Sequence, residues 1–193
     1  MDSCVSDIIL EFLGVAFHNV LYYASVYPRS IFETRKKYSV VVYRSMHPEV
    51  NEYIDLCLKS AAECLKSGQL KRVEIVITSN KHEPLMKFVF DLDKNDFFDE
   101  TCDAYLVQAE QNMRAFVLNL TTLSDKFKSL PEDRSFMILL FTNESAAVAM
   151  ATNPDLEEFP MIEMNKMVEF ERILPIRRFG LRNVSIDSYV ELT

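Results

Sequence analysis

Histidines, cysteines and paired carboxylates are the side chains of this sequence that could do chemistry, and their spacing argues against a catalytic site. His18, His47 and His82 lie far apart, and none belongs to the HExxH arrangement of a zinc hydrolase. No GxSxG elbow for a serine nucleophile is present. With only three glycines, the chain cannot form a glycine-rich phosphate loop. The sequence predicts a protein that is not an enzyme, with no catalytic residue, cofactor or metal.

The remaining polar candidates have simple structural interpretations. His18 lies in an apolar stretch, where a hydrogen-bonded core residue is expected. The acidic pairs Asp91/Asp93 and Glu157/Glu158 are expected to be solvated charges at strand ends or in loops rather than a general acid and base.

The four cysteines show no sign of a metal site. Cys4, Cys57, Cys64 and Cys102 form no CxxC pair and have no histidine at ligand spacing. Cys57 and Cys64 are seven residues apart and would share one helix face, where packing is the expected role. No signal peptide is recognised, so reduced cysteines inside the cell are expected.

Composition indicates one globular domain with an acidic surface. The chain has 193 residues, of which 49% are apolar, including 14 Phe and 8 Tyr. Its 21 Lys and Arg against 29 Asp and Glu give a net charge of −8, which disfavours binding to a phosphate backbone. The densest basic run, residues 35–37, is therefore expected to be a solvated connector; a protein-binding patch is the second interpretation and a DNA contact the third.

Hydrophobic periodicity predicts two helices in the first third of the chain. Residues 5–27 are apolar nearly all round, which predicts a core helix rather than a membrane span because polar residues interrupt it. Residues 48–68 form a second helix with Pro48 at its first position and Gly68 at its C-terminal cap.

The following segments alternate between strand and helix patterns. Residues 71–78 and 85–92 predict a hairpin, residues 99–127 a third helix, residues 135–142 a buried strand and residues 37–44 one short strand. The expected class is α+β.

The last 50 residues differ from the rest of the chain. Three strand-like pieces, EFPMI, VEFERILPIRRF and NVSIDSYVEL, are separated by prolines. A long segment of this kind is usually functional or mobile, and a strand that adds to a sheet edge would fit it.

Four strings give the sequence a family resemblance. The strings EFLGVAFHNVLYYASVYPRSIFETRKKYSVVV, HPEVNEYI, KFVFDL and QNMRAFVLNL closely resemble the HORMA-domain family. The resemblance implies a single domain over residues 1–193, in which three helices pack on a small antiparallel sheet. It also implies a core at residues 1–143 and a strand-rich safety belt at residues 144–193.

The branch of the family that the strings resemble implies a function as an adaptor. It is the branch of accessory, non-catalytic subunits of DNA polymerase zeta in translesion synthesis. The implied partners are a proline-containing segment of the catalytic subunit, held under the belt, and the C-terminal domain of a scaffold translesion polymerase. The alternative is a spindle-checkpoint regulator that binds an activator of the anaphase-promoting complex. The implied location is the nucleus, with the cytoplasm second, and no contact with nucleic acid or membrane is expected.

The same resemblance assigns the partner channel. Tyr53 matches a tyrosine that lines it, where the ring gives a rigid contact and the hydroxyl can bond a peptide carbonyl. Phe159, Pro160 and Met161 fall in the belt, and Met161 stands where the family has a tryptophan over the prolines of the partner. The apolar clamp is retained by Met161, but aromatic stacking is lost.

Two further surfaces follow from the resemblance. Arg114 matches an arginine used in pairing of HORMA domains, which implies a homodimer or a heterodimer with another HORMA protein. A surface salt bridge within the monomer is the alternative. Ile173, Asp187 and Tyr189 stand where the family docks the scaffold polymerase, with Asp187 in place of an uncharged polar residue.

Overall fold

The computed structural model describes residues 3–94, 105–127, 130–142 and 171–192. They form three α-helices, seven β-strands and two short 3₁₀ turns. The elements are α1 (Ser3–Tyr23), η1 (Arg29–Ile31), β1 (Phe32–Lys37), β2 (Val40–Ser45), α2 (Pro48–Lys66), β3 (Arg72–Ser79), β4 (Pro84–Lys94), α3 (Tyr105–Leu123), η2 (Ser124–Phe127), β5 (Arg134–Phe141), β6 (Arg172–Leu181) and β7 (Val184–Leu192).

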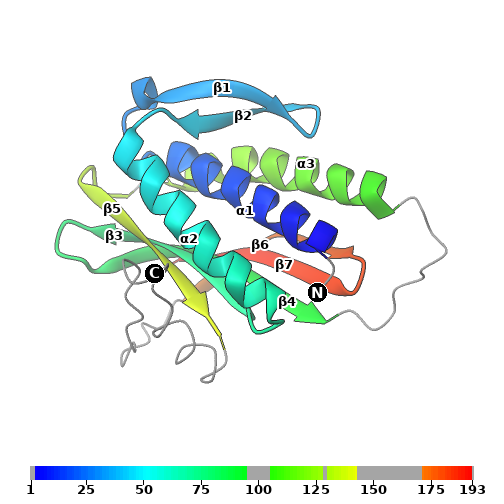
Figure 1. Cartoon of the computed structure of the whole chain (residues 1–193). Helices are drawn as coiled ribbons and strands as arrows, with labels where there is room; N and C mark the ends of the chain where they lie inside the picture. Colours follow the sequence, from blue (N-terminus) through cyan, green and yellow to red (C-terminus); the bar gives the residue numbers. More distant parts are fainter. Residues whose placement is uncertain (1–2, 95–104, 128–129, 143–170, 193) are drawn as a thin grey trace.

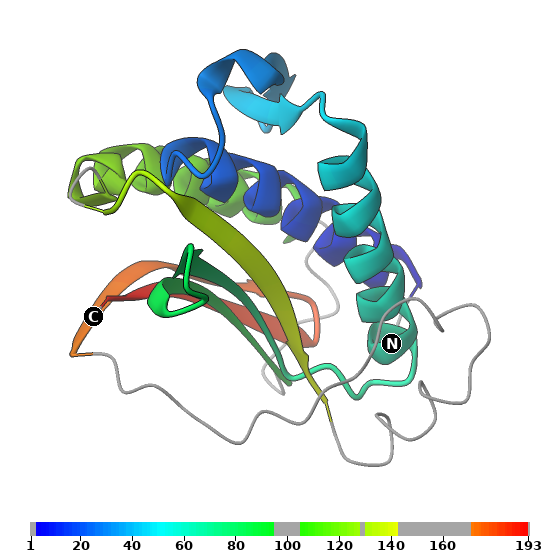
Figure 2. The same cartoon turned by 90° about the vertical axis from the view of Figure 1, so that its left-hand side faces the viewer.

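The elements stack in three layers. An antiparallel sheet of order β5-β3-β4-β7-β6 forms the base, and the three helices cover one of its faces (Figure 1). The β1–β2 hairpin lies on the far side of the helices from the sheet, as Figure 2 shows from the side. The predicted α+β arrangement of three helices on an antiparallel sheet is confirmed.

Helix α1 is the centre of the core. Its Phe12 ring meets three other rings edge-on, with centroid distances of 6.2 Å to Phe90, 5.1 Å to Phe116 and 5.5 Å to Phe179. These rings come from β4, α3 and β6. One side chain of α1 therefore packs against another helix and against two strands of the sheet. By length and hydropathy α1 could cross a membrane, but most of its apolar window is buried inside the protein, as in a core helix.

Helix α2 ends as its sequence predicts. Gly68 has a φ of 68°, and its N–H donates to the Leu65 carbonyl at 3.0 Å. The Gln69 N–H donates to the Cys64 carbonyl at 2.8 Å, so the last carbonyls of the helix are satisfied. Cys57 and Cys64 are both buried, which confirms the packing role expected of them.

The prediction of one strand over residues 37–44 is wrong. The structure has two strands, joined by a turn at Tyr38 and Ser39 with φ values of 51° and 59°. Neither residue is the Gly or Asn that signals such a turn. Burial of the Tyr38 ring and a 3.4 Å hydrogen bond from its hydroxyl to Glu11 favour this backbone conformation.

The prediction that residues 135–142 form a buried strand is also wrong in part. The strand exists as β5, but it lies at an edge of the sheet, and Ile138 is its one fully buried residue. The apolar run SFMILLF does not reveal that the strand lies at an edge, because the side chains on both faces of β5 are half-buried.

Two buried polar residues of α1 hold the β1–β2 hairpin. The Tyr43 N–H donates to Asn19 Oδ1 at 3.2 Å, and the Ser45 N–H donates to His18 Nδ1 at 3.3 Å. The outward amides of β2 are thus bonded to side chains rather than to another strand. His18 is a hydrogen-bonded core residue, as predicted, and burial lowers its pKa from 6.5 to about 4, with a further contribution from Arg44.

We expect His18 to make stability depend on pH. Between pH 6.5 and 4 the unfolded chain binds a proton on this residue while the folded protein resists it, so stability falls as the pH drops through that window. The loss amounts to at most about 3 kcal/mol. Urea unfolding at several pH values checks this, with His18→Gln as the control that keeps an acceptor but cannot titrate. The variant should show a flatter profile, and identical profiles would contradict the assignment.

Candidate partner-binding edge of the sheet

The outer edge of β5 offers unpaired backbone groups. The Ile138 N–H points away from β3 and donates to the hydroxyl oxygen of Tyr53 on α2 at 3.0 Å. Because alternate residues of a strand turn their amides the same way, the N–H groups of Phe136 and Leu140 also face this edge. Within the residues that the structure describes, no strand pairs with this side of β5. The edge can therefore accept another strand.

A groove of about 550 Å³ opens beside this edge. Aromatic rings form much of its wall, since Phe136 meets Tyr53 at 5.5 Å and Tyr27 at 6.1 Å, both edge-on. The other residues along it are His47, Glu49, Val50 and Ser135. An extended segment lying on β5 would place alternate side chains against these rings.

The chemistry of Tyr53 suits it to such a contact. Burial raises its pKa to about 12, so the hydroxyl stays neutral and acts as a hydrogen-bonding group. Its oxygen accepts a hydrogen bond from the Ile138 N–H, and its hydroxyl donates to the side chain of the neighbouring Cys57. Sulfur is a weak acceptor, so the carbonyl of an incoming segment could take the proton instead. The structure therefore places Tyr53 at the open edge of the sheet.

Side chains of α3 contact the opposite edge of the sheet at β6. Asn119 of α3 donates its side-chain N–H to the Ile176 carbonyl of β6 at 2.8 Å, and Arg177 donates to Asn112 Oδ1 at 2.6 and 2.9 Å. The register of β6 also shifts between Pro175 and Arg177. An edge with a register shift and a proline is a poorer template for a further strand, which favours β5 as the site of strand addition.

The two edges are connected by residues 142–171. β5 ends at Phe141 on one edge of the sheet, and β6 begins at Arg172 on the other. Phe159, Pro160 and Met161, predicted as the belt residues of the site, lie outside the described residues.

The outer face of the sheet gathers the three residues predicted to dock a scaffold polymerase. Asp187 and Tyr189 alternate along β7, and Ile173 lies opposite Glu191 on the adjoining strand β6. Ile173 is 62% exposed, the highest value among the large apolar side chains of the described residues. The structure thus brings Ile173, Asp187 and Tyr189 onto one surface.

The prediction that Asp91 is a solvated charge is wrong. Its carboxylate accepts two hydrogen bonds from Arg72, at 2.5 and 3.3 Å, and one from the Tyr189 hydroxyl at 2.9 Å. Burial, followed by the bond to Asp91, raises the pKa of Tyr189. Sequence spacing could not reveal this cluster, because register places Arg72 and Asp91 opposite each other across strands.

A second charge cluster lies one row further along the same face. Lys87 bonds Glu191 at 2.8 Å and lies 3.6 Å from Glu74. Glu74 is buried, which raises the pKa of its carboxyl against the opposing effect of Lys87 and Arg72. Together the two clusters link β3, β4 and β7 and fix the orientation of the outer face.

Arg114 lies on the exposed face of α3. It makes no ion pair in the described part of the chain, so the alternative of a salt bridge within the monomer finds no support there. One and two turns away, Leu118 and Val107 are 47% and 59% exposed. The structure therefore places Arg114 in a partly apolar surface of α3.

Comparison with known proteins identifies the class that this fold and edge define. The model of the HORMA domain family matches residues 5–161, and the chain belongs to this family. Over 190 residues it is 33% identical to the human (Homo sapiens) mitotic spindle assembly checkpoint protein MAD2B, covering 97% of this chain and 90% of that protein. It is 27% identical to DNA polymerase zeta subunit 2 of Drosophila melanogaster, covering 83% of this chain and 81% of the relative.

Solved structures agree with this fold. A chain in the crystal structure of the mitotic checkpoint complex matches with a TM-score of 0.83 at 19% identity, covering 97% of this chain and 98% of that one. C. elegans HTP-2 bound to HTP-3 closure motif 1 matches with a TM-score of 0.73 at 12% identity, and the match covers 97% of this chain and 85% of that one. At these identities the matches support the fold alone.

We expect Tyr53→Phe to loosen the β5 edge without removing the aromatic wall. The Ile138 N–H then faces α2 without its acceptor, at a cost of about 1 kcal/mol. Amide hydrogen exchange at Ile138 should speed up by about fivefold. Tyr23→Phe is the matched control, because it removes a hydroxyl that is bonded to Thr121 elsewhere in the protein. Unchanged exchange at Ile138 in Tyr53→Phe would contradict this role.

Proposed function

We propose that the chain is a non-catalytic accessory subunit of DNA polymerase zeta in translesion DNA synthesis. It would clamp an extended, proline-containing segment of the catalytic subunit and bridge it to a scaffold translesion polymerase. The observation that carries this proposal is the open β5 edge beside an aromatic groove. Support comes from relatives named as DNA polymerase zeta subunit 2 and DNA polymerase zeta processivity subunit.

The edge of β5 would bind the segment through its backbone. The outward amides of Phe136 and Leu140 would pair with the segment, as in other complexes formed by strand addition. The rings of Tyr27, Tyr53 and Phe136 would contact its side chains, and proline suits this contact because it is rigid and extended. Backbone pairing would supply affinity, and the groove would supply selectivity.

The proposed belt, residues 144–193, would make exchange of the segment slow. It starts next to β5 and ends in β6 and β7, which are part of the sheet. A segment covered by the connecting chain cannot leave until that chain moves, so association and release both depend on a conformational step. Phe159, Pro160 and Met161 are the residues proposed to cover it.

The outer face would serve the scaffold polymerase independently of the edge. Ile173 offers an exposed apolar contact, and Tyr189 is held by Asp91 and Arg72. Asp187 lies beyond Tyr189 on the same face, away from Ile173, and would favour a cationic or hydrogen-bonding partner group. Arg114 on α3 is a third, separate surface, proposed for pairing with a second HORMA domain. The nucleus, with the cytoplasm second, is the proposed location.

Binding of the catalytic-subunit segment should depend on Tyr53. We expect Tyr53→Ala in the full chain to weaken binding of a labelled proline-containing segment at least tenfold, mainly through faster dissociation. A binding titration with measured dissociation rates checks this. Ile173→Ala is the control, because its side chain lies on the other surface and should leave this binding unchanged. Equal affinity in Tyr53→Ala and the unchanged protein would overturn the clamp at β5.

Binding of the scaffold polymerase domain should show the reverse pattern. We expect Ile173→Ala and Tyr189→Phe to weaken binding of that domain, since they remove an apolar contact and a group that orients the surface. Tyr53→Ala should leave it unchanged. Calorimetry with the isolated scaffold domain measures all three variants. Loss of binding in Tyr53→Ala alone would place the scaffold partner on the edge instead.

A spindle-checkpoint regulator is the second candidate. The relative named MAD2B carries the checkpoint function in its name, and this motivates the comparison. In this case the β5 edge would hold a segment of an activator of the anaphase-promoting complex. One edge cannot hold two strands, so competition between the two segments distinguishes the candidates. Tighter binding of the activator segment would favour the checkpoint function.

A further inference from the structure

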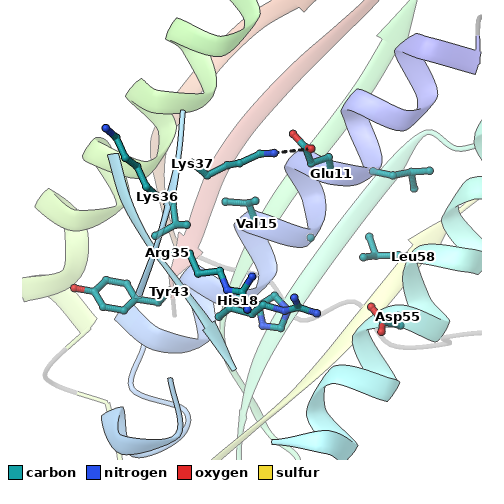
Figure 3. Close-up of a pocket in the computed structure, with 13 residues that line it drawn as sticks. Glu11, Val15, His18, Arg35, Lys36, Lys37, Tyr43, Asp55 and Leu58 are labelled. Atoms are coloured by element: carbon teal, nitrogen blue, oxygen red, sulfur yellow. Dashed lines mark hydrogen bonds and ion pairs between the residues drawn. The ribbon is translucent and has the colours of Figure 1, made fainter. Parts of the chain in front are cut away.

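A second cavity lies on the side of the helices away from the sheet. It has a volume of about 470 Å³ and is bounded by α1, α2 and the β1–β2 hairpin (Figure 3). Its floor is the contact between α1 and α2 at Gly14, where an added Cβ would lie 3.3 Å from Leu58 Cδ1. The volume falls within the range of about 300–1,000 Å³ that is usual for ligand sites. The β5 edge has no part in it.

The hairpin wall of this cavity is cationic. Arg35, Lys36, Lys37 and Arg44 all line it, in a chain whose net charge is −8. Lys37 reaches Glu11 at 2.7 Å (Figure 3), and Arg35 bonds Glu33 at 2.6 Å, so these two are already neutralised. The Lys36 side chain points away from the cavity (Figure 3), whereas Arg44 makes no ion pair with the described residues. Arg44 is thus an available cation of the hairpin wall.

The α1 wall adds a buried hydrogen-bond donor. The ring of His18 lines the cavity and is 8% exposed. Its Nδ1 accepts the Ser45 amide, so the neutral ring carries its proton on Nε2. No hydrogen bond to Nε2 is formed by the described part of the chain. A donor held in this way can bind an acceptor on a ligand without carrying a charge itself.

The α2 wall carries the opposite charge. Asp55 lines the cavity across from the hairpin and makes no ion pair with the described residues (Figure 3). A ligand that fits must therefore offer acceptors to one wall and donors to the other. A phosphate ion offers acceptors mainly, and Asp55 would repel it. A peptide with an acidic side chain offers a carboxylate and backbone N–H groups together.

We propose that this cavity binds an acidic segment of a partner protein. An Asp or Glu carboxylate of the segment lies against Arg44 and His18 Nε2–H, and a backbone N–H of the segment donates to Asp55. The site is separate from the β5 edge, so a partner bound here and a segment bound at β5 can be present together. This proposal does not depend on the proposed function.

A capped tetraglutamate peptide is the probe that tests the site in the full chain. Backbone amide spectra recorded during its titration should show the largest shifts at Ser45 and Gly14. We expect Arg44→Gln to weaken tetraglutamate binding at least fivefold, because it removes the cation that faces the carboxylate. Asp55→Asn removes a negative charge and should favour inorganic phosphate more than tetraglutamate, because the peptide also loses a charged acceptor for its backbone N–H. Arg172→Gln, an exposed Arg at the start of β6, is the matched control and should change binding less than twofold.

Other results would overturn the proposal. Equal weakening by Arg172→Gln and Arg44→Gln would mean that the peptide responds to net charge alone. Equal binding of capped tetraglutamine would remove the role of the carboxylate, and preferential binding of phosphate would assign the cavity to a small anion. Tyr53→Ala should leave tetraglutamate binding unchanged. Loss of binding in that variant would move the probe to the β5 edge.

Discussion

The unpaired edge of β5 is the feature on which the rest of this structure depends. A sheet edge in water presents N–H and C=O groups that will pair with another strand unless they are covered. At β6 the edge is irregular, and Asn119 of α3 donates to the Ile176 carbonyl there. At β5 one amide, that of Ile138, donates to a tyrosine hydroxyl, and no strand of the described residues pairs with the neighbouring amides. The two edges of the sheet therefore differ in their ability to pair with a further strand.

The core holds that edge in place. Phe12 packs against rings from β4, α3 and β6, so the C-terminal strands are part of the same core as the N-terminal helix. Loss of a buried phenylalanine typically costs about 3–5 kcal/mol, a large share of the stability of one domain. On the outer face, Arg72 and Asp91 join β3 to β4, and the Tyr189 hydroxyl extends the link to β7. These contacts tie the edge strand β5, through β3, to the centre of the sheet.

Local sequence patterns predicted most of the helices and strands. They did not predict which strands, distant in sequence, pair with each other. The periodicity of α2 and its Gly68 cap, and the apolar surface of α1, depend on neighbours in sequence and were predicted correctly. The edge position of β5 and the ion pair of Asp91 depend on strand order and register, which no local pattern encodes. The turn at Tyr38 was missed because its stability comes from burial and from Glu11, a residue on another element. Tyr53 was identified through family resemblance, and its hydroxyl contact became visible only in the structure.

Hydrogen exchange along β5 tests the central claim most directly. In the free protein, the amides of Met137 and Leu139 face β3 and should be protected, while those of Phe136 and Leu140 should exchange quickly. Addition of the proline-containing segment of the catalytic subunit should protect Phe136 and Leu140 strongly. Tight binding of the segment with no new protection at these two amides would contradict strand addition at β5.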